Sequence, residues 1–204
     1  MTHEGHNGSN GRTSGLTGEG RAQAKPPLEL QPPSTLRELL AYVAEDYRAH
    51  DRDTTRPGFR AVAVHRFGNY RMHWKRPWRS GMTLVYFALY RHVRNHYGIE
   101  LPFSAKLGRR VVIEHQGAIV IHGSSVIGDD CIIRQGVTLG NRTLSAPFDA
   151  PVLGKKVNVG AGAKLLGLVR VGDGANIGAN SVVLRDVPAG RTAIGVPARV
   201  LDET

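Results

Sequence analysis

Residues 153–183 read LGKKVNVGAGAKLLGLVRVGDGANIGANSVV, and every sixth residue of this stretch is aliphatic. A period of six fits neither an α-helix, which needs about 3.6 residues per turn, nor a single strand, whose side chains alternate with a period of about 2. It fits a solenoid in which each six-residue unit makes one flat side and one corner, with its aliphatic residue pointing inward. The stretch therefore predicts a parallel β-helix.

The same period extends toward the N-terminus, so we expect the β-helix to occupy residues 100–200. Its aliphatic anchors form three groups with steps of six inside each: Leu107, Ile113 and Ile119; Ile127, Ile133 and Leu139; Leu153, Val159, Leu165, Val171, Ile177 and Val183. A glycine follows many anchors, and we expect it to supply unusual backbone dihedral angles at the corners.

Two interruptions break the period. The phase shifts by two residues between Ile119 and Ile127, and a longer break covers residues 141–152. Insertions into solenoids form loops, often on the functional face. We therefore expect the specific chemistry near these two places.

The preceding chain divides into two segments. Residues 1–33 are polar and glycine-rich, so they cannot bury enough surface to offset the entropy of ordering and are expected to be a disordered tail. Residues 34–99 are expected to form a short helical region. Its first helix should follow a cap at Ser34 or Thr35 and use the apolar spacing that begins at Leu36.

Two further helices are expected in this region. One should cover about Phe59–Trp74, and another should follow Ser80 and end near Gly98. No apolar run approaches the roughly 18 residues of a membrane span, and the N-terminus lacks the apolar core of a signal peptide. Because the single cysteine, Cys131, cannot form an internal disulfide, a cytoplasmic location is the default and a buried thiol is expected.

The chain of 204 residues has a formal net charge of +10. Such a charge can indicate a nucleic-acid partner, or it can reflect a solvated surface rich in arginine. Apart from a cluster between Arg60 and Arg79 the basic residues are scattered, and no aromatic-interleaved basic patch is present. We therefore expect no nucleic-acid partner, although the charge would attract an anionic cofactor.

Several short motifs accompany the six-residue period: GAGAK at 160–164, IGANSVV at 177–183, GVPA at 195–198, QGVTLG at 135–140, and Pro57-Gly-Phe59 with Ala61, His65 and Arg66. They resemble those of one family, the hexapeptide-repeat acyltransferases, and most closely its serine O-acetyltransferase branch. The resemblance covers roughly residues 50–200, and the helical region before the β-helix is much shorter here than in the family. It implies a left-handed coil, homotrimers with active sites between subunits, and acetyl-CoA as the cosubstrate of an O-acetyltransferase.

The resemblance implies a catalytic pair. His115 lies where the family has its catalytic histidine, and a near-neutral pKa suits a general base that takes a proton from a hydroxyl. Glu100 occupies the position of the family's aspartate partner, which would fix the tautomer of the histidine. Without the motif, His115 could equally be a surface residue at a coil corner.

The acceptor-binding positions depart from the family pattern. The family's second active-site histidine falls at Ala150, and an arginine that would bind a carboxylate falls at Asp149. Glu114 keeps an acid at its position, and Asp53 is a candidate for binding a substrate amine. These changes speak against free serine and leave either a serine-like or a sugar hydroxyl as the acceptor.

A further histidine, His122, lies within the phase shift between Ile119 and Ile127. It is a second candidate substrate-binding group, although a histidine at such a place is more often an exposed loop residue.

Coenzyme A in this family contacts mainly backbone groups and small residues. The resemblance implies contacts for it at these positions: Gly140, Asn141, Ala161, Ala179 and Pro197. No metal is expected. The alternative to an enzyme is a non-catalytic β-helix scaffold or regulatory homologue, which the loss of the second histidine suggests.

Overall fold

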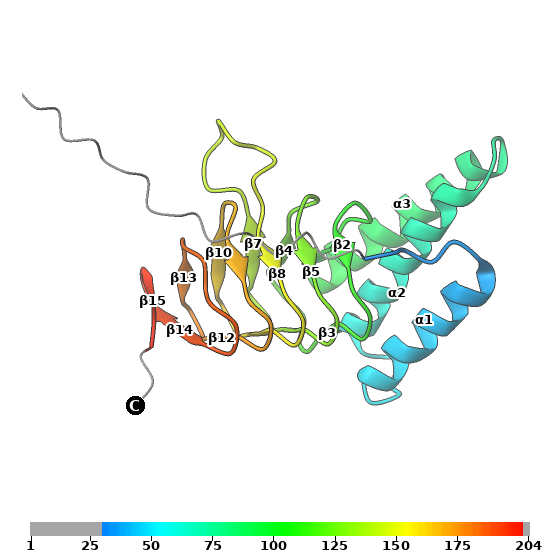
Figure 1. Cartoon of the computed structure of the whole chain (residues 1–204). Helices are drawn as coiled ribbons and strands as arrows, with labels where there is room; N and C mark the ends of the chain where they lie inside the picture. Colours follow the sequence, from blue (N-terminus) through cyan, green and yellow to red (C-terminus); the bar gives the residue numbers. More distant parts are fainter. Residues whose placement is uncertain (1–29, 202–204) are drawn as a thin grey trace, which may run out of the picture.

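The computed structural model describes residues 30–201, in which a small helical region precedes a β-helix (Figure 1). Most of the expected disordered tail, residues 1–33, lies outside the described residues. The helices are α1 (Leu36–Ala49), α2 (Pro57–Tyr70), the short 3-10 helix η1 (Arg71–His73) and α3 (Trp78–Tyr97). The strands are β1 (Ile99–Glu100), β2 (Lys106–Leu107), β3 (Val112–Ile113), β4 (Ile119–Ile121), β5 (Val126–Ile127), β6 (Ile132–Ile133), β7 (Thr138–Gly140), β8 (Val152–Leu153), β9 (Asn158–Val159), β10 (Lys164–Leu166), β11 (Arg170–Val171), β12 (Asn176–Ile177), β13 (Val182–Val183), β14 (Thr192–Gly195) and β15 (Ala198–Val200).

The predicted left-handed parallel β-helix is confirmed. Each full coil contributes one strand to each of three parallel sheets. Sheet A contains β1, β4, β7, β10 and β13; sheet B contains β2, β5, β8 and β11; sheet C contains β3, β6, β9, β12 and β14, with β15 added antiparallel at its end. The predicted anchors point inward, where they stack and form the core.

The phase shift lies at a different corner from the one that the sequence indicates. Ile121, not Ile119, pairs with Leu139 in the next coil, and both isoleucines are buried. Since Ile113 pairs with Ile133, the two extra residues lie between Ile113 and Ile121. They lengthen the corner that carries His115, and the corner residues Gly117 and Ala118 both have positive φ angles.

The glycines after the anchors serve close approach rather than positive φ, so our explanation of them was wrong. A Cβ at Gly128 would lie 2.3 Å from the carbonyl oxygen of Gly154, and one at Gly160 would lie 2.6 Å from the amide nitrogen of Ala179. At one corner the left-handed conformation is adopted instead by residues such as Arg110, Asp130 and Lys156. The next coil therefore lies too close to these glycines to leave room for a side chain.

The predicted helices are present with small differences at their ends. Thr35 caps α1 in a reciprocal capping box with Glu38, as its sequence suggests. The second helix begins at Pro57, whose fixed φ suits a first helical turn, and it ends at Tyr70. The third begins at Trp78, before Ser80, and ends at Gly98 in a left-handed cap.

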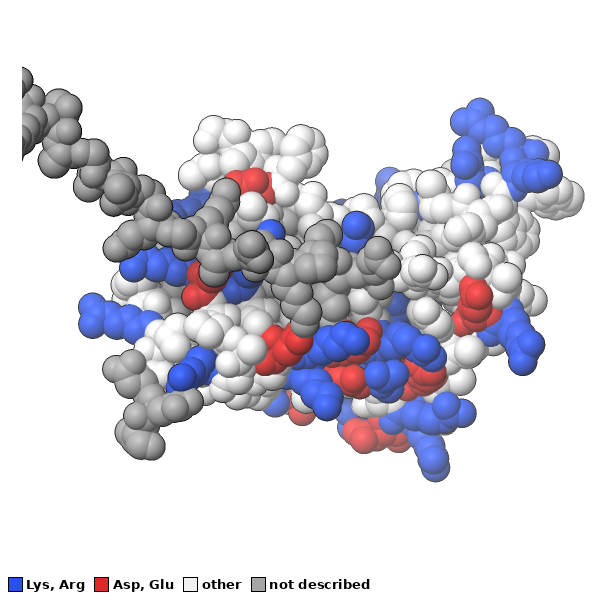
Figure 2. Space-filling model, in the orientation of Figure 1, with Lys and Arg blue, Asp and Glu red and all other residues white. Residues whose placement is uncertain are grey.

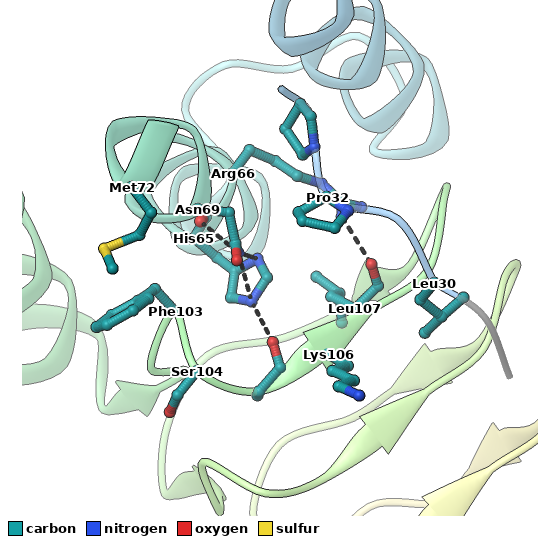
Figure 3. Close-up of a pocket in the computed structure, with 12 residues that line it drawn as sticks. Leu30, Pro32, His65, Arg66, Asn69, Met72, Phe103, Ser104, Lys106 and Leu107 are labelled. Atoms are coloured by element: carbon teal, nitrogen blue, oxygen red, sulfur yellow. Dashed lines mark hydrogen bonds between the residues drawn. The ribbon is translucent and has the colours of Figure 1, made fainter. Parts of the chain in front are cut away.

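The helices pack against the N-terminal end of the β-helix, where the first coil has no preceding coil to pair with. His65 Nε2 lies 2.9 Å from the carbonyl oxygen of Ala105, and Arg66 donates to the carbonyl oxygens of Leu107 (2.9 Å) and Gly108 (2.5 Å). Figure 3 shows His65 and Arg66 reaching the backbone of this coil beside a cavity of about 230 Å³. These side chains satisfy backbone groups that would otherwise be unpaired and buried.

A buried ion pair fixes this arrangement. Arg66 Nε lies 2.9 Å from Asp46 Oδ2, and both side chains are almost fully buried. The pair joins α1 to α2, while the remaining Arg66 donors reach the β-helix. Burial of a charged pair is tolerated here because the guanidinium is hydrogen-bonded on several sides.

Candidate active site

The corner where the chain passes from sheet C to sheet A, called here the C–A corner, brings His115 into line with two predicted coenzyme A positions. His115 follows β3 and is exposed, and Ala161 and Ala179 occupy the same corner in later coils. Backbone hydrogen bonds join the successive turns: Gly136 N to Gly117 O (2.9 Å), Gly162 N to Gln135 O (2.8 Å) and Asn180 N to Ala161 O (2.8 Å).

The turn between β14 and β15 extends this column. It carries Pro197, and the amide of Gly195 donates to the Ser181 hydroxyl at 3.1 Å. Gly140 and Asn141 lie elsewhere, at the opposite edge of sheet A, where the chain leaves β7 for the long loop (Figure 1). One copy of the chain thus presents the predicted coenzyme A positions on two separate edges.

A cavity of about 500 Å³ lies beside His115, at the end of the column nearest the helices. It is formed where the turn after α1 and the start of α2 meet the lengthened corner. Its lining residues are Asp51, Arg56, Pro57, Gly58, Glu114, His115 and Gln116. A reacting hydroxyl bound in this cavity would have the imidazole of His115 in its wall.

The charged groups of the cavity are paired within the chain. Arg56 lies 2.7 Å from Asp51, with these side chains 38% and 72% exposed. Glu114 lies 2.6 Å from Arg134 Nε, and Arg134 also donates to the Asn158 side chain at 2.5 Å. The cavity therefore has a balanced electrostatic character rather than an excess of positive charge.

The position of the strand that leads into His115 is set by the helices. The amide of Ile113 donates to His50 Nε2 at 3.3 Å, while His50 Nδ1 lies 2.7 Å from the carbonyl oxygen of Asp46. This arrangement fits a neutral imidazole that donates from Nδ1, and burial lowers the pKa of His50. Gly58 packs on the other side, where a Cβ would lie 1.9 Å from the Ile113 carbonyl oxygen.

Glu100 is half-buried in β1, and the side chain of Tyr90 lies near it. Burial, followed by the charge of Glu100, raises the pKa of Tyr90 to about 12. Among residues 30–201, no described contact joins Glu100 to His115. The carboxylate is thus held on sheet A, and its pairing with the histidine stays a prediction.

The structure does not bring Asp53 to the cavity. Its carboxylate accepts hydrogen bonds from the amide and hydroxyl of Thr55, at 2.7 and 2.6 Å, and these bonds lower its pKa. Asp51 lies in the cavity wall instead, at a position with φ of 57°. Sequence spacing gives no signal for this difference, because it depends on how the turn after α1 packs.

His122 and Asp149 also lie outside the cavity lining. His122 follows β4, at the opposite end of this strand from His115, and its Nδ1 accepts from the amide of Ser124 at 3.1 Å. Asp149 is exposed near the end of the long loop. Among the residues that sequence reasoning missed, Arg56 and Gln116 line the cavity and Arg134 pairs with Glu114.

The remaining chemistry-bearing features are structural. Cys131 is buried, as expected, and its thiol donates to the carbonyl oxygen of Gly154 at 3.1 Å. Burial raises the pKa of this thiol to about 12, which is unsuited to a nucleophile. Within residues 30–201, no group of three or more His, Cys, Asp or Glu side chains is placed to hold a metal ion, and no helix is long and apolar enough to cross a membrane.

Comparison with known proteins identifies the family. No protein-family model matches the chain. A curated serine acetyltransferase of Helicobacter pylori is 41% identical over 145 residues, which cover 71% of this chain and 81% of the relative. The chain belongs to the serine acetyltransferase family.

Other members differ from this chain in length. Serine acetyltransferases of Synechococcus elongatus and Salmonella typhimurium are 39% and 40% identical, but the matches cover only 57% and 50% of those proteins. The chain thus spans about half the length of these two curated relatives.

Solved structures of serine acetyltransferases share the fold. A crystal structure of the Brucella abortus protein matches with a TM-score of 0.71 at 30% identity, over 83% of this chain and 71% of the other. A serine acetyltransferase in complex with coenzyme A matches with a TM-score of 0.68 at 33% identity, over 81% and 71%.

One departure from the serine acetyltransferase pattern is also structural. Ala150, where the resemblance places the family's second histidine, is only 2% exposed. A histidine side chain would not fit this position without a change in the loop. The end of the loop is therefore built around a small buried residue in this member of the serine acetyltransferase family.

Proposed function

We propose that this chain is an acetyl-CoA-dependent O-acetyltransferase that transfers an acetyl group to an alcohol, either serine-like or a sugar hydroxyl. The observation that carries the proposal is the column of the C–A corner, which connects His115 and its cavity to Ala161 and Ala179. A thioester laid along this column has its reacting end near the imidazole and the acceptor cavity. Small side chains at the corners allow the pantetheine to approach the backbone.

The reaction requires no covalent enzyme intermediate. His115 takes the proton of the acceptor hydroxyl while its oxygen attacks the thioester carbonyl carbon. The tetrahedral intermediate then collapses, the carbon–sulfur bond breaks, and the imidazolium returns the proton to the coenzyme A thiolate. The products are the O-acetyl ester and free coenzyme A.

We further propose that Glu100 orients His115. The support is its position by resemblance and its place on sheet A. Reorientation from Tyr90 toward the histidine would be required, so Glu100→Gln should lower kcat whereas Tyr90→Phe should leave it equal or raise it. Equal losses in both variants would favour a role for the Glu100–Tyr90 contact alone.

We propose a homotrimer as the assembly. The predicted coenzyme A positions lie on two edges of one copy, so a neighbouring copy could bring its Gly140 and Asn141 to the His115 column. The long loop exposes apolar side chains, with Leu144 95% and Phe148 80% exposed. Light scattering should give a trimer mass, and Phe148→Ser should shift the protein toward smaller species.

The direct test is release of free thiol from acetyl-CoA with acceptors that include serine, homoserine and sugars. Removal of a general base costs about 10²–10⁴-fold, so His115→Ala should lose nearly all turnover while its circular dichroism stays unchanged. His73→Ala, which removes an exposed histidine from η1, is the matched control. Full activity of His115→Ala would contradict the mechanism.

The second candidate is a non-catalytic scaffold, which the alanine at position 150 favours. Coenzyme A discriminates the two. A ligand that binds the native state raises the melting temperature by mass action, so an unchanged melting temperature at millimolar coenzyme A would favour the scaffold. The cytoplasmic location and the lack of a nucleic-acid partner stay predictions. Acidic side chains do lie among the basic ones on the face shown in Figure 2.

A further inference from the structure

His122 lies at the edge of sheet A where the chain passes to sheet B, called here the A–B edge. It follows β4 directly, whereas His115 precedes β4 on the C–A corner. A strand of three residues spans about 10 Å, so the two side chains of one copy lie at opposite edges of the sheet. His122 is also outside the described lining of the cavity beside His115. One copy therefore does not bring both histidines to the same reacting group.

The ring of His122 is held in one tautomer. Its Nδ1 accepts a hydrogen bond from the amide of Ser124 at 3.1 Å, so Nδ1 carries no proton. A neutral imidazole then carries its proton on Nε2. The side chain is half-buried, and in the part of the chain that the structure describes no hydrogen bond or ion pair engages Nε2. His122 thus presents a free N–H donor and has no nitrogen left to act as a base.

The backbone places His122 directly beneath a predicted coenzyme A position. Ile121 pairs with Leu139, and the amide of His122 donates to the carbonyl oxygen of Leu139 at 2.7 Å. The next residue along, Gly140, therefore stacks on His122 in the following coil. Because both residues lie on the A–B edge, a copy that contacts Gly140 of its neighbour has that neighbour's His122 in the same contact.

The proposed trimer brings this edge to His115. In it the C–A corner of one copy meets the A–B edge of the next, so sheet A, which lies between them, faces the three-fold axis with its coils stacked along that axis. Rotation about an axis moves nothing along it, and each coil therefore meets the same coil of its neighbour. His115 and His122 flank the same strand, β4. In this trimer, His122 of one copy is therefore level with His115 of the next.

We propose that His122 of a neighbouring copy donates a hydrogen bond to the oxyanion of the tetrahedral intermediate. This inference rests on the proposed acetyltransferase function and trimer, and it supplies an oxyanion donor, which His115 as the base does not provide. As the acceptor oxygen bonds to the thioester carbon, the carbonyl π electrons move onto the carbonyl oxygen, where the Nε2–H group stabilises the charge. The proton stays on Nε2, and collapse of the intermediate restores the carbonyl as the carbon–sulfur bond breaks.

Two substitutions separate this role from a structural one. In His122→Asn the side-chain oxygen can still accept from the amide of Ser124, two residues further on, but no donor reaches the position of Nε2. In His122→Gln the longer side chain can place its amide group near that position. Loss of one oxyanion donor costs about 10²–10³-fold in kcat, and we expect a loss of this size in His122→Asn. His122→Gln should lose less, and both variants should keep the melting temperature and the KM for acetyl-CoA of the parent protein.

Mixed trimers test whether the histidine comes from another copy. His115→Ala and His122→Asn chains with different tags are co-expressed, and trimers that contain both are purified through the two tags. One of the three interfaces in such a trimer joins an intact His115 to an intact His122, so thiol release from acetyl-CoA should recover to about one third of the parent rate. Trimers that combine His115→Ala with the double variant His115→Ala/His122→Asn contain no complete site and should stay inactive.

The outcomes separate this role from the function on which it rests. Full kcat in His122→Asn, a larger loss in His122→Gln than in His122→Asn, or no recovery in the mixed trimers would overturn the role of His122 while the parent protein stays an active acetyltransferase. A parent protein that releases no thiol with any acceptor of the panel would instead overturn the acetyltransferase function, and this role with it.

Discussion

The first and fourth coils of the β-helix have the same architecture but are held in different ways. The fourth coil, β10–β12, lies between two other coils and is stabilised by regular backbone pairing and stacked aliphatic anchors. The first coil has helices on its lower side, so side chains such as His50, His65 and Arg66 take over the pairing. The candidate functional side chains lie at the end of the repeat, because side chains there are not constrained to stack on the same position of a preceding coil.

The largest expected effect comes from removing a side chain that supports the first coil. Arg66→Met leaves Asp46 as an uncompensated buried charge, and loss of one partner of such a pair costs about 3–5 kcal/mol. Urea unfolding followed by circular dichroism measures this loss. Arg185→Met, at an exposed position next to β13, should change stability by less than about 0.5 kcal/mol; similar losses in both variants would remove the distinction between the coils.

The pH dependence of stability should reveal the buried histidines. Burial, followed by the charge of Arg66, lowers the pKa of His65 to about 3, against about 6.5 in an unfolded chain. Below pH about 6.5 the unfolded chain takes up a proton that the folded chain excludes. The contribution of His65 is therefore complete above that pH and is lost toward pH 3 by about 1.4 kcal/mol per pH unit.

The control for this prediction is His65→Gln, which removes the titrating group. Unfolding free energies measured between pH 7 and pH 4 should decline less steeply in the variant than in the parent chain. Parallel pH profiles would show that folding does not lower the pKa of His65.

A smaller effect should sharpen the contrast between stacked coils and helices. Gly128→Ala forces a Cβ toward the backbone of the next coil and should cost about 1–3 kcal/mol through overpacking. Gly81→Ala in α3 meets nothing within 4 Å and should stabilise the chain by up to about 1 kcal/mol. Melting temperatures that move in the same direction would contradict this interpretation of the glycines.

The smallest expected change is one of rate rather than stability. In His50→Gln the side-chain amide oxygen can still accept a hydrogen bond from the amide of Ile113. In His50→Asn the side chain is too short for this bond, and its amide nitrogen can only donate to the carbonyl oxygen of Asp46. Because small displacements of a catalytic group are costly, His50→Asn should lower kcat about tenfold and His50→Gln less, with KM for acetyl-CoA unchanged. Equal kcat in both variants would show that this hydrogen bond does not position His115.

The sequence was sufficient for the regular parts of the fold. The six-residue period predicts the inward anchors, and the residues around Thr35 and Gly98 predict helix ends, because these signals are local. The period could not locate the inserted residues, since Ile119 and Ile121 are both buried and either could be the stacking anchor. The cavity could not be predicted from the sequence either, because it brings Asp51 and Glu114 together through the packing of distant segments.

The helical region also terminates the β-helix at its N-terminal end. An uncovered coil presents rows of unpaired amides and carbonyls that could recruit the strands of another molecule and grow into a fibre. His50, His65 and Arg66 occupy part of this edge at one end, and the antiparallel β15 covers sheet C at the other. The residues that support the first coil therefore also protect the chain from end-to-end polymerisation.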